Sequence, residues 1–226
     1  MFLQALFCGV SAGRARRAFL PRAPLLLLCL VLAPAAWAEG PRTLLIFGDS
    51  LSAAYGLETR QGWVARLAAG LPPDVKLINA SISGETTSGG LSRLPGLLAT
   101  HRPAWVVLEL GANDGLRGLP PRRIEDNIDR LLGMIRTSGA QALLVGIQLP
   151  PNYGPLYGQG FAQMFPRLAR AHNVPLVPFL LEGVADRPEW MQPDGLHPNA
   201  QGQERVLDNV RPVLAPLLMS PPDRAP

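Results

Sequence analysis

The stretch Thr43-Leu-Leu-Ile-Phe-Gly-Asp-Ser-Leu-Ser52 is an apolar run that ends at Gly48 and places Ser50 directly after Asp49. A run of five or six apolar and β-branched residues, closed by a glycine, predicts a strand that is covered on both faces, as in a parallel sheet. In open α/β sheets, ligands bind at the carboxyl ends of such strands. The stretch therefore predicts a buried strand that delivers a serine to a ligand-binding edge.

From residue 43 onward, the chain alternates strand-like and helix-like segments. The first strand is expected at 43–47, and further strands are expected at 75–79, 104–110, 142–147 and 175–178. Helices are expected at 62–70, 91–101, 121–138, 161–172 and 198–218. This alternation predicts a five-stranded, mainly parallel sheet between two layers of helices, a three-layer α/β/α fold.

The helix expected over 121–138 has the clearest pattern. Pro121 suits a first helical turn, and the apolar residues that follow recur at helical spacing. These residues are Ile124, Ile128, Leu131, Leu132 and Ile135. The pattern predicts a helix with one face packed on the sheet.

Residues 1–38 have the layout of a secretory signal peptide. Four arginines and no acid precede a leucine-rich segment, and Ala36-Trp37-Ala38 matches a cleavage site. The apolar segment is shorter than the roughly 20 residues that a spanning helix needs. We therefore expect cleavage near Ala38, a periplasmic or secreted protein with no integral membrane span, a domain over 39–218 and a disordered tail over 219–226. Arg16-Arg17 leaves the general and twin-arginine export routes open.

Removing this leader changes what composition implies. The chain has 21 Lys+Arg and 17 Asp+Glu, and without the four leader arginines it has 17 of each. The high pI therefore gives no support to nucleic-acid binding. Both cysteines, Cys8 and Cys29, also lie in the leader, which excludes thiol catalysis, disulfides and cysteine-ligated zinc in the mature chain. We expect no metal or cofactor, and a monomer.

Polar residues follow three of the predicted strands and precede the last helix. Ser50 follows the first strand, Gly84 the second and Asn113 the third, and Asp194 and His197 lie three residues apart near the last helix. Because parallel strands end at one edge of a sheet, these residues are expected to share one cleft. The sequence thus provides a serine, a histidine and an acid for one site.

Each of these residues has a role in acyl transfer. A serine hydroxyl becomes nucleophilic when a neighbouring histidine takes its proton, and Asp194 would orient His197 and stabilise its imidazolium form. The backbone N–H groups of Ser50 and Gly84 and the amide of Asn113 could stabilise the oxyanion, each by about 3 kcal/mol. The absent side chain of Gly84 would let its N–H approach the substrate.

The proline after His197 leads to one more expectation. Pro198 is favoured at the first position of a helix, which would place His197 near the N-cap of the helix at 198–218. There the helix dipole would oppose a positive charge, and Asp194 would offset this effect. We expect these two influences to keep His197 neutral and basic at pH 7.

Four motifs in order resemble the blocks of the SGNH hydrolases, also known as GDSL esterases. They are Gly48-Asp49-Ser50-Leu51-Ser52, Gly84 in its Ser-x-Ser-Gly loop, Gly111-x-Asn113-Asp114 and Asp194-x-x-His197-Pro198. The segments at 79–84, 109–118 and 149–154 are similar to the bacterial periplasmic thioesterase, arylesterase and lysophospholipase branch. Ala112 and Glu85 differ from the residues common in that branch and remove no catalytic group.

The resemblance implies a flavodoxin-like fold and a catalytic triad of Ser50, Asp194 and His197. It also implies an oxyanion hole of Ser50, Gly84 and Asn113, and a segment at 115–120 that moves on acyl binding. The residues expected to contact substrate are Gly115, Leu116, Leu119, Leu149, Pro150 and Tyr153. Cleavage of carboxylic esters and thioesters, including aryl esters and lysophospholipids, is the implied activity.

Substrate class is less determined than mechanism. The apolar stretch from Leu149 to Tyr157 is either one wall of an acyl groove or a packed proline-rich loop. Two other functions also remain open at this point: a carbohydrate O-acetyl esterase on the same scaffold, and a binding protein without enzymatic activity.

Overall fold

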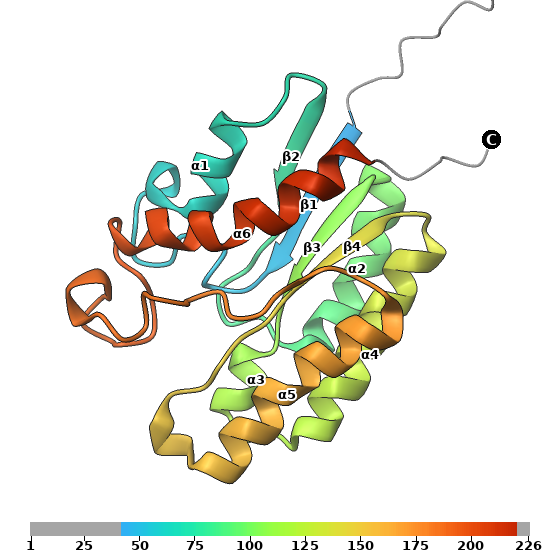
Figure 1. The fold of residues 1–226 in the computed structure, drawn as a ribbon. Helices are drawn as coiled ribbons and strands as arrows, with labels where there is room; N and C mark the ends of the chain where they lie inside the picture. The colour runs from blue at the N-terminus through green and yellow to red at the C-terminus, as the bar shows by residue number, and fades with distance from the viewer. Residues whose placement is uncertain (1–41, 221–226) are drawn as a thin grey trace, which may run out of the picture. The chain divides into compact units, whose positions relative to one another are not determined.

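Five parallel strands form one sheet in the order β2-β1-β3-β4-β5, in a computed structural model that describes residues 42–220 (Figure 1). The strands are β1 (Arg42–Gly48), β2 (Val75–Asn79), β3 (Trp105–Glu109), β4 (Gln141–Val145) and β5 (Leu176–Val177). The expected five-stranded parallel sheet is confirmed, and its strand order is that of flavodoxin-like folds. The expected leader at 1–38 and residues 221–226 of the expected tail lie outside the described residues.

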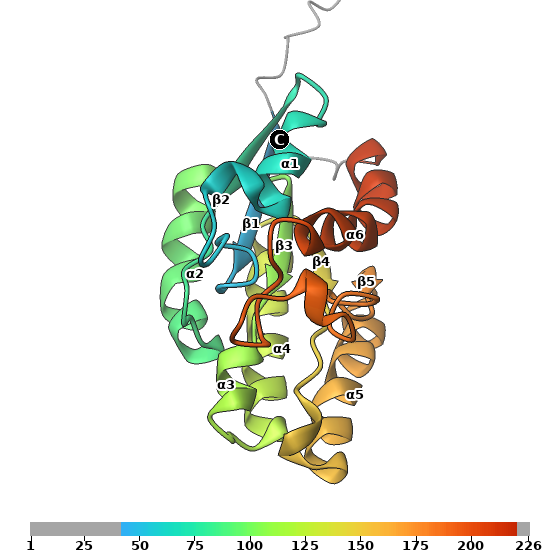
Figure 2. The ribbon, with the colours of Figure 1, turned by 90° about the vertical axis from the view of Figure 1, so that its left-hand side faces the viewer.

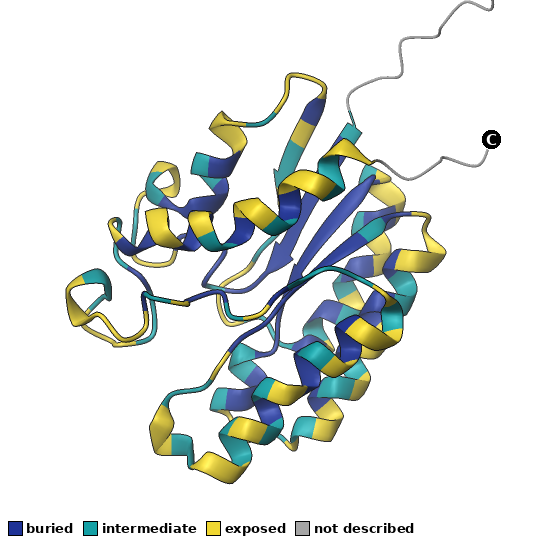
Figure 3. Cartoon of the chain, viewed as in Figure 1, coloured by how far each residue is buried: buried dark blue, intermediate teal, exposed yellow. Residues whose placement is uncertain are grey.

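The apolar run at 43–47 forms most of β1, and both faces of the strand are buried. Leu45 and Phe47 pack in one hydrophobic cluster, whereas Leu44 and Ile46 pack in the other. Successive side chains of a strand point to opposite faces, so a continuous apolar run satisfies two cores at once. β1 and β3 are accordingly buried along nearly their whole length (Figure 3).

Helices cover the two faces of the sheet (Figure 2). α1 and α6 pack against each other over one face, and α2, α4 and α5 cover the other. The bounds are α1 (Trp63–Ala69), α2 (Thr87–His101), α3 (Ala112–Leu116), α4 (Pro121–Thr137), α5 (Pro155–His172) and α6 (Gly202–Met219). Three short 3-10 helices lie at Thr59–Gln61, Pro151–Tyr153 and Pro188–Trp190. Between residues 42 and 220, no helix is both long and apolar enough to cross a bilayer.

The expected helix at 121–138 is confirmed as α4. Pro121 stands in its first turn, and the five apolar residues at helical spacing are all buried. Their common face packs on the sheet, the flanks of the helix pack against α2 and α5, and its outer side is exposed (Figure 3). Helical spacing therefore predicted both the helix and its buried side.

Two helices begin earlier than expected. α2 starts at Thr87 rather than 91, because the side chain of Thr86 accepts a hydrogen bond from the N–H of Gly89 and caps the helix. α5 starts at Pro155 rather than 161, with the proline in the first turn, where its missing N–H has no cost. The second half of the proline-rich stretch is therefore helical.

The last helix begins later than expected. α6 starts at Gly202, and Pro198 instead forms an antiparallel bridge with Met191. The side-chain oxygen of Asn199 accepts hydrogen bonds from the N–H groups of Gln201 and Gly202 and so turns the chain into the helix. The helix ends at Met219, one residue beyond the expected end of the domain.

The order of the strands also locates the main cleft. The chain moves outward from β1 to β2 and then crosses to β3 on the other side of β1. Ligands bind at such a switch point, outside the carboxyl ends of the two central strands. Ser50 follows β1 there, and the short helix α3, which the sequence did not predict, follows β3.

Candidate active site

Ser50, His197 and Asp194 form one chain of hydrogen-bonding contacts. Ser50 Oγ lies 2.8 Å from His197 Nε2, and His197 Nδ1 lies 2.6 Å from Asp194 Oδ2. The imidazole therefore joins the hydroxyl of one loop to the carboxylate of a loop 144 residues further along the chain. In this arrangement the histidine can take a proton from the serine on one nitrogen while the acid fixes the other.

A tight turn after β1 presents Ser50. The N–H groups of Ser52 and Ala53 donate to the carbonyl of Asp49 at 3.2 and 3.0 Å, and the Leu51 N–H donates to Asp49 Oδ1 at 3.0 Å. Asp49 is fully buried, whereas Ser50 is partly exposed. The buried aspartate thus anchors a turn that leaves the next residue facing the cleft.

A second turn presents Asp194 and His197. Asp194 Oδ1 accepts the N–H groups of Leu196 and His197 at 2.9 and 3.1 Å. Partial burial opposes ionisation of Asp194, but these bonds and the ring of His197 outweigh it and lower the pKa of the carboxyl group. Asp194 is therefore a carboxylate at neutral pH.

The expectation that His197 stands at a helix N-terminus is wrong. α6 begins at Gly202, so His197 and Pro198 belong to the turn before it. The effect of a helix dipole is confined to the first turn of a helix, so the dipole of α6 does not set the charge of His197. The contacts that hold the imidazole are instead those with Asp194 and Ser50.

The three expected oxyanion donors differ in whether they are already hydrogen-bonded. In residues 42–220, no hydrogen bond uses the N–H of Ser50 or of Gly84. Gly84 has φ +79°, and a Cβ there would meet nothing within 4 Å. The backbone conformation of residue 84 therefore favours a glycine, and the space around it is free of protein atoms.

The Asn113 side chain, the third expected donor, already has two acceptors. Its Nδ2 donates to Asp49 Oδ2 at 3.1 Å and to the carbonyl of Glu85 at 3.0 Å. An amide nitrogen carries two hydrogens, so both are in use. A substrate oxyanion would have to take over one of these bonds.

Two buried carboxyl groups lie beneath the serine. Asp49 and Glu109 are both fully buried. Burial raises the pKa of Asp49 to about 7, although hydrogen bonds from Leu51 and Asn113 oppose the rise. Burial and the neighbouring charge of Asp49 raise the pKa of Glu109 well above its usual range. The sequence analysis assigned no role to either group.

A cleft of about 620 Å³ adjoins this group of residues, and Ser50, Asn113 and His197 line it. Of the residues expected to contact substrate, Leu116, Leu149 and Pro150 also line it. Gly84, Gly115, Leu119 and Tyr153 are not among the lining residues. One part of the apolar stretch is thus a wall of the cleft, and another part is packed.

Gly115, Leu119 and Tyr153 lie behind the wall of the cleft. A Cβ on the buried Gly115 would lie 2.7 Å from Phe161 and 2.8 Å from Leu149, so close packing explains that glycine. Tyr153 Oη donates to the carbonyl of Leu116, and Tyr157 Oη donates its one hydrogen to the carbonyl of Leu119 at 2.7 Å, with the carbonyl oxygen of Gly115 also in reach at 3.1 Å. These bonds tie the 115–119 segment to the start of α5.

The sequence analysis missed several residues at the site. Phe179 and Leu181 also line the cleft, together with Glu182 and Asp186. They follow the carboxyl end of β5, a position that could have identified them. No comparable signal marks Tyr55, whose ring centroid lies 4.5 Å from that of His197.

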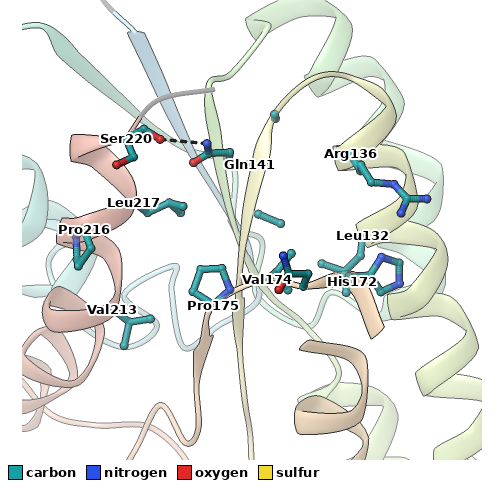
Figure 4. A pocket seen from close by; sticks show the side chains of 13 residues that line it. Leu132, Arg136, Gln141, His172, Val174, Pro175, Val213, Pro216, Leu217 and Ser220 are labelled. Atoms are coloured by element: carbon teal, nitrogen blue, oxygen red, sulfur yellow. Dashed lines mark hydrogen bonds between the residues drawn. The ribbon is translucent and has the colours of Figure 1, made fainter. Parts of the chain in front are cut away.

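A second cavity, of about 530 Å³, lies at the opposite edge of the sheet (Figure 4). Residues at the start of β4, before β5 and on α4 and α6 line it, among them Arg136, Gln141 and Leu217. None of the expected site residues does so. The expected chemistry is therefore confined to the carboxyl edge.

Fold and site together define a class: α/β proteins in which a serine, a histidine and an acid meet at the carboxyl edge of a parallel sheet. The model of the GDSL-like Lipase/Acylhydrolase family matches residues 46–205. The chain belongs to that family, and it is therefore an enzyme. The alternative of a binding protein without enzymatic activity is excluded.

Three relatives are similar over most of the chain. Esterase TesA of Pseudomonas aeruginosa is 50% identical over 200 residues, which cover 87% of this chain and all of the relative. A solved crystal structure of a TesA, 50% identical in sequence, covers 77% of this chain with a TM-score of 0.74, and the match spans 99% of that structure. Thioesterase 1/protease 1/lysophospholipase L1 of Escherichia coli K12 is 44% identical, covering 86% of this chain and 92% of the relative. The arylesterase of Vibrio mimicus is also 44% identical, covering 82% of this chain and 94% of the relative.

Proposed function

We propose that the protein is an exported serine hydrolase that cleaves carboxylic esters and thioesters through an acyl-enzyme at Ser50. The observation that carries this proposal is the 2.8 Å contact between Ser50 Oγ and His197 Nε2, continued at 2.6 Å to Asp194. A hydroxyl in that position has a base within reach, and the base has an orienting acid. The names of the relatives, esterase, thioesterase/lysophospholipase and arylesterase, support the substrate class.

In acylation, Ser50 Oγ bonds to the acyl carbon as its proton passes to His197 Nε2. His197 then gives that proton to the oxygen or sulfur of the leaving group as its bond to the acyl carbon breaks. In deacylation, His197 takes a proton from water as the water oxygen bonds to the acyl carbon. The bond from that carbon to Ser50 Oγ then breaks, Oγ takes the proton back from His197, and the carboxylic acid leaves. Asp194, ionised at neutral pH, stabilises the imidazolium in both halves.

The oxyanion would be held by the free N–H groups of Ser50 and Gly84 and by the amide of Asn113. The amide can take part when it exchanges one of its bonds, to Asp49 or to the Glu85 carbonyl, for the oxyanion. A negatively charged oxygen is a stronger acceptor than a carbonyl, so the exchange with Glu85 favours the transition state. We expect this exchange to contribute to kcat rather than to substrate affinity.

The cleft suits an acyl chain next to the serine. Its apolar lining includes Leu116, Leu149 and Pro150 together with Phe179 and Leu181. Contact with these apolar side chains would favour esters with several carbons in the acyl group. We therefore infer a broad esterase and arylesterase with thioesterase and lysophospholipase activity. A carbohydrate O-acetyl esterase remains the alternative.

Residues 1–38 would direct export and be removed near Ala38, and 39–218 would form the catalytic domain. Export bears on the substrate, because acyl-CoA is made inside the cell. Lysophospholipids and acyl or aryl esters outside the cytoplasm would then be the substrates encountered. N-terminal sequencing of the exported protein tests this point, with Glu39 as the expected first residue.

The activity is tested with a fluorophosphonate probe and a chain-length series of p-nitrophenyl esters. The parent protein should become labelled at Ser50, and Ser50→Ala should lose both the label and the hydrolysis. Comparison with acyl thioesters and a lysophospholipid then ranks the substrates. A strict preference for acetyl esters would contradict the lipid assignment and favour the carbohydrate esterase.

A further inference from the structure

Glu109, the last residue of β3, is a fully buried acid that the triad does not use. Its Oε2 accepts the hydroxyl of Ser52 at 2.7 Å and the N–H of Asp49 at 3.2 Å. Asp49 and Ser52 are the two residues between which the turn presents Ser50. One carboxyl group therefore accepts hydrogen bonds from both ends of the turn, an arrangement that we call the clasp.

The same carboxyl group explains the glycine that precedes this turn. Gly48 pairs with Glu109 across the β1–β3 ladder. A Cβ at residue 48 would lie 2.5 Å from Glu109 Oε2 and 2.9 Å from Ser52 Oγ. Such contacts are shorter than side chains tolerate, so the glycine makes room for the carboxyl group. Gly48 and Ser52 of the Gly-Asp-Ser-Leu-Ser motif thus both have Glu109 as their partner.

The other oxygen of Glu109 indicates its charge. Oε1 is buried and accepts no hydrogen bond from any residue between 42 and 220. The side chain lies within hydrogen-bonding reach of the Asp49 carboxyl group. Two buried carboxylates in contact cannot both stay ionised, whereas a proton on one makes it a donor to the other. A proton on Glu109 would therefore supply the donor between the two carboxyl groups.

The groups around the pair favour the neutral form as well. Asp114, which is also fully buried, adds negative charge near Asp49. The remaining polar partners of the pair are neutral: the Ser52 hydroxyl, the Leu51 N–H and the Asn113 amide. No cation bonds to either carboxyl group among the residues that the structure describes. Nothing present would stabilise two negative charges there.

We propose that Glu109 is a positioning residue that works in its protonated, neutral form. It clasps the turn that carries Ser50 and donates a hydrogen bond to Asp49, which in turn holds the amide of Asn113. This inference rests on the proposed role of Ser50. Since the Ser50 N–H and the Asn113 amide are both proposed oxyanion donors, displacement of the turn should lower kcat and leave KM nearly unchanged.

Two substitutions separate a neutral clasp from the alternatives. Glu109→Gln keeps the shape, an acceptor for Ser52 and Asp49, and a donor toward Asp49. Glu109→Leu keeps only the approximate volume. On a soluble p-nitrophenyl ester at pH 7, we expect kcat of the Gln variant within about threefold of the parent, since its hydrogen bonds persist. We expect kcat of the Leu variant to fall about 100-fold, a loss typical of a misplaced catalytic group.

Two further variants serve as references. Gln203→Leu removes another buried polar side chain, which accepts the N–H of Trp63 at 2.9 Å, and it controls for loss of stability alone. Its kcat should match the parent. Ser50→Ala tests the proposed function separately: if it keeps full activity, the assignment of Ser50 fails, whatever the Glu109 variants do.

Stability gives a second readout that does not depend on activity or on the Leu variant. At a pH above its unfolded pKa, a carboxyl group that keeps its proton only in the folded state makes the folded state bind more protons than the unfolded state. Stability therefore falls as pH rises from about 4 through the folded pKa. The melting temperature of the parent should fall between pH 5 and pH 8 by at least about 4 °C more than that of Glu109→Gln.

The outcomes divide cleanly. An active Gln variant, an inactive Leu variant and a flatter stability profile for Gln support the proposal. Equal loss of kcat in both variants would mean that a charged carboxylate is needed. Full activity in both variants would mean that the clasp is not needed for catalysis. Either result overturns the proposal. Equal pH dependence of the melting temperature in the parent and Gln variant overturns it as well.

Discussion

The ring of Tyr55 stacks on the ring of His197, with the two centroids 4.5 Å apart and the planes inclined by 36°. Tyr55 comes from the loop after β1 and is 48% exposed. The carbonyl of Tyr55 also accepts a hydrogen bond from Gln192, in the loop that carries His197. The loop that carries Ser50 thus contacts His197 twice, through Ser50 itself and through the ring of Tyr55.

Removing this ring should weaken catalysis. Tyr55→Ala is expected to lower kcat up to about tenfold, because stacked aromatic pairs contribute about 0.5–1.5 kcal/mol. Tyr55→Phe keeps the ring and should retain the parental kcat. Steady-state kinetics on one ester measures both. An equal loss in the Phe variant would assign the effect to the hydroxyl and not to the stack.

Replacing Asn113 tests the exchange of its hydrogen bonds. Asn113→Ala should lower kcat by about 10²–10³-fold with little change in KM, as expected for a group that binds an oxyanion only in the transition state. The same variant leaves Asp49 Oδ2 without its donor. Circular dichroism at pH 7 should therefore be recorded beside the kinetics, and a raised KM at unchanged kcat would contradict the assignment.

The lowered pKa of Asp194 predicts sensitivity to acid. A carboxyl group with a folded pKa below its unfolded value stabilises the folded state above the unfolded pKa, and this contribution is lost as pH falls through the folded pKa. Between pH 5 and pH 3, the melting temperature of the parent should therefore fall more than that of Asp194→Asn. Parallel curves for the two proteins would show that the pKa of Asp194 is not lowered.

Adding a methyl group at Gly48 should destabilise the fold. The new Cβ would lie 2.5 Å from Glu109 Oε2 in a fully buried site, so Gly48→Ala is expected to cost about 1–3 kcal/mol. Gly133→Ala in α4 is a matched control, since a Cβ there meets nothing within 4 Å. It should stabilise the protein by about 0.5–1 kcal/mol through helix propensity. Urea denaturation of the two variants tests the contrast.

The local patterns of the chain predicted the frame of the molecule well. The run at 43–47 and the helical spacing between Ile124 and Ile135 each depend on burial against the sheet, and burial determines which residue types can occur. Polar residues at strand ends also predicted which residues would meet, because parallel strands end at one edge. Ser50 after β1 and Asn113 after β3 line one cleft for this reason.

Other features depended on contacts between distant segments and could not be predicted. The start of α6 is shifted because Pro198 bridges to Met191 and Asn199 caps the turn. The two hydrogens of Asn113 are taken by groups from two other loops. Glu109 did leave a signal, since an acid at the end of the apolar run 104–110 is unusual for a buried strand.

Part of the cleft wall comes from segments that carry no reacting group. Half of the apolar wall residues follow β4 or β5, at 147–151 and 179–181, whereas Ser50 and His197 lie in other loops and Asn113 lies in α3. Substrate preference can therefore drift in evolution, or be redesigned by exchanging two short loops, while the chemistry stays intact. A single scaffold of this kind can give rise to enzymes with quite different substrates.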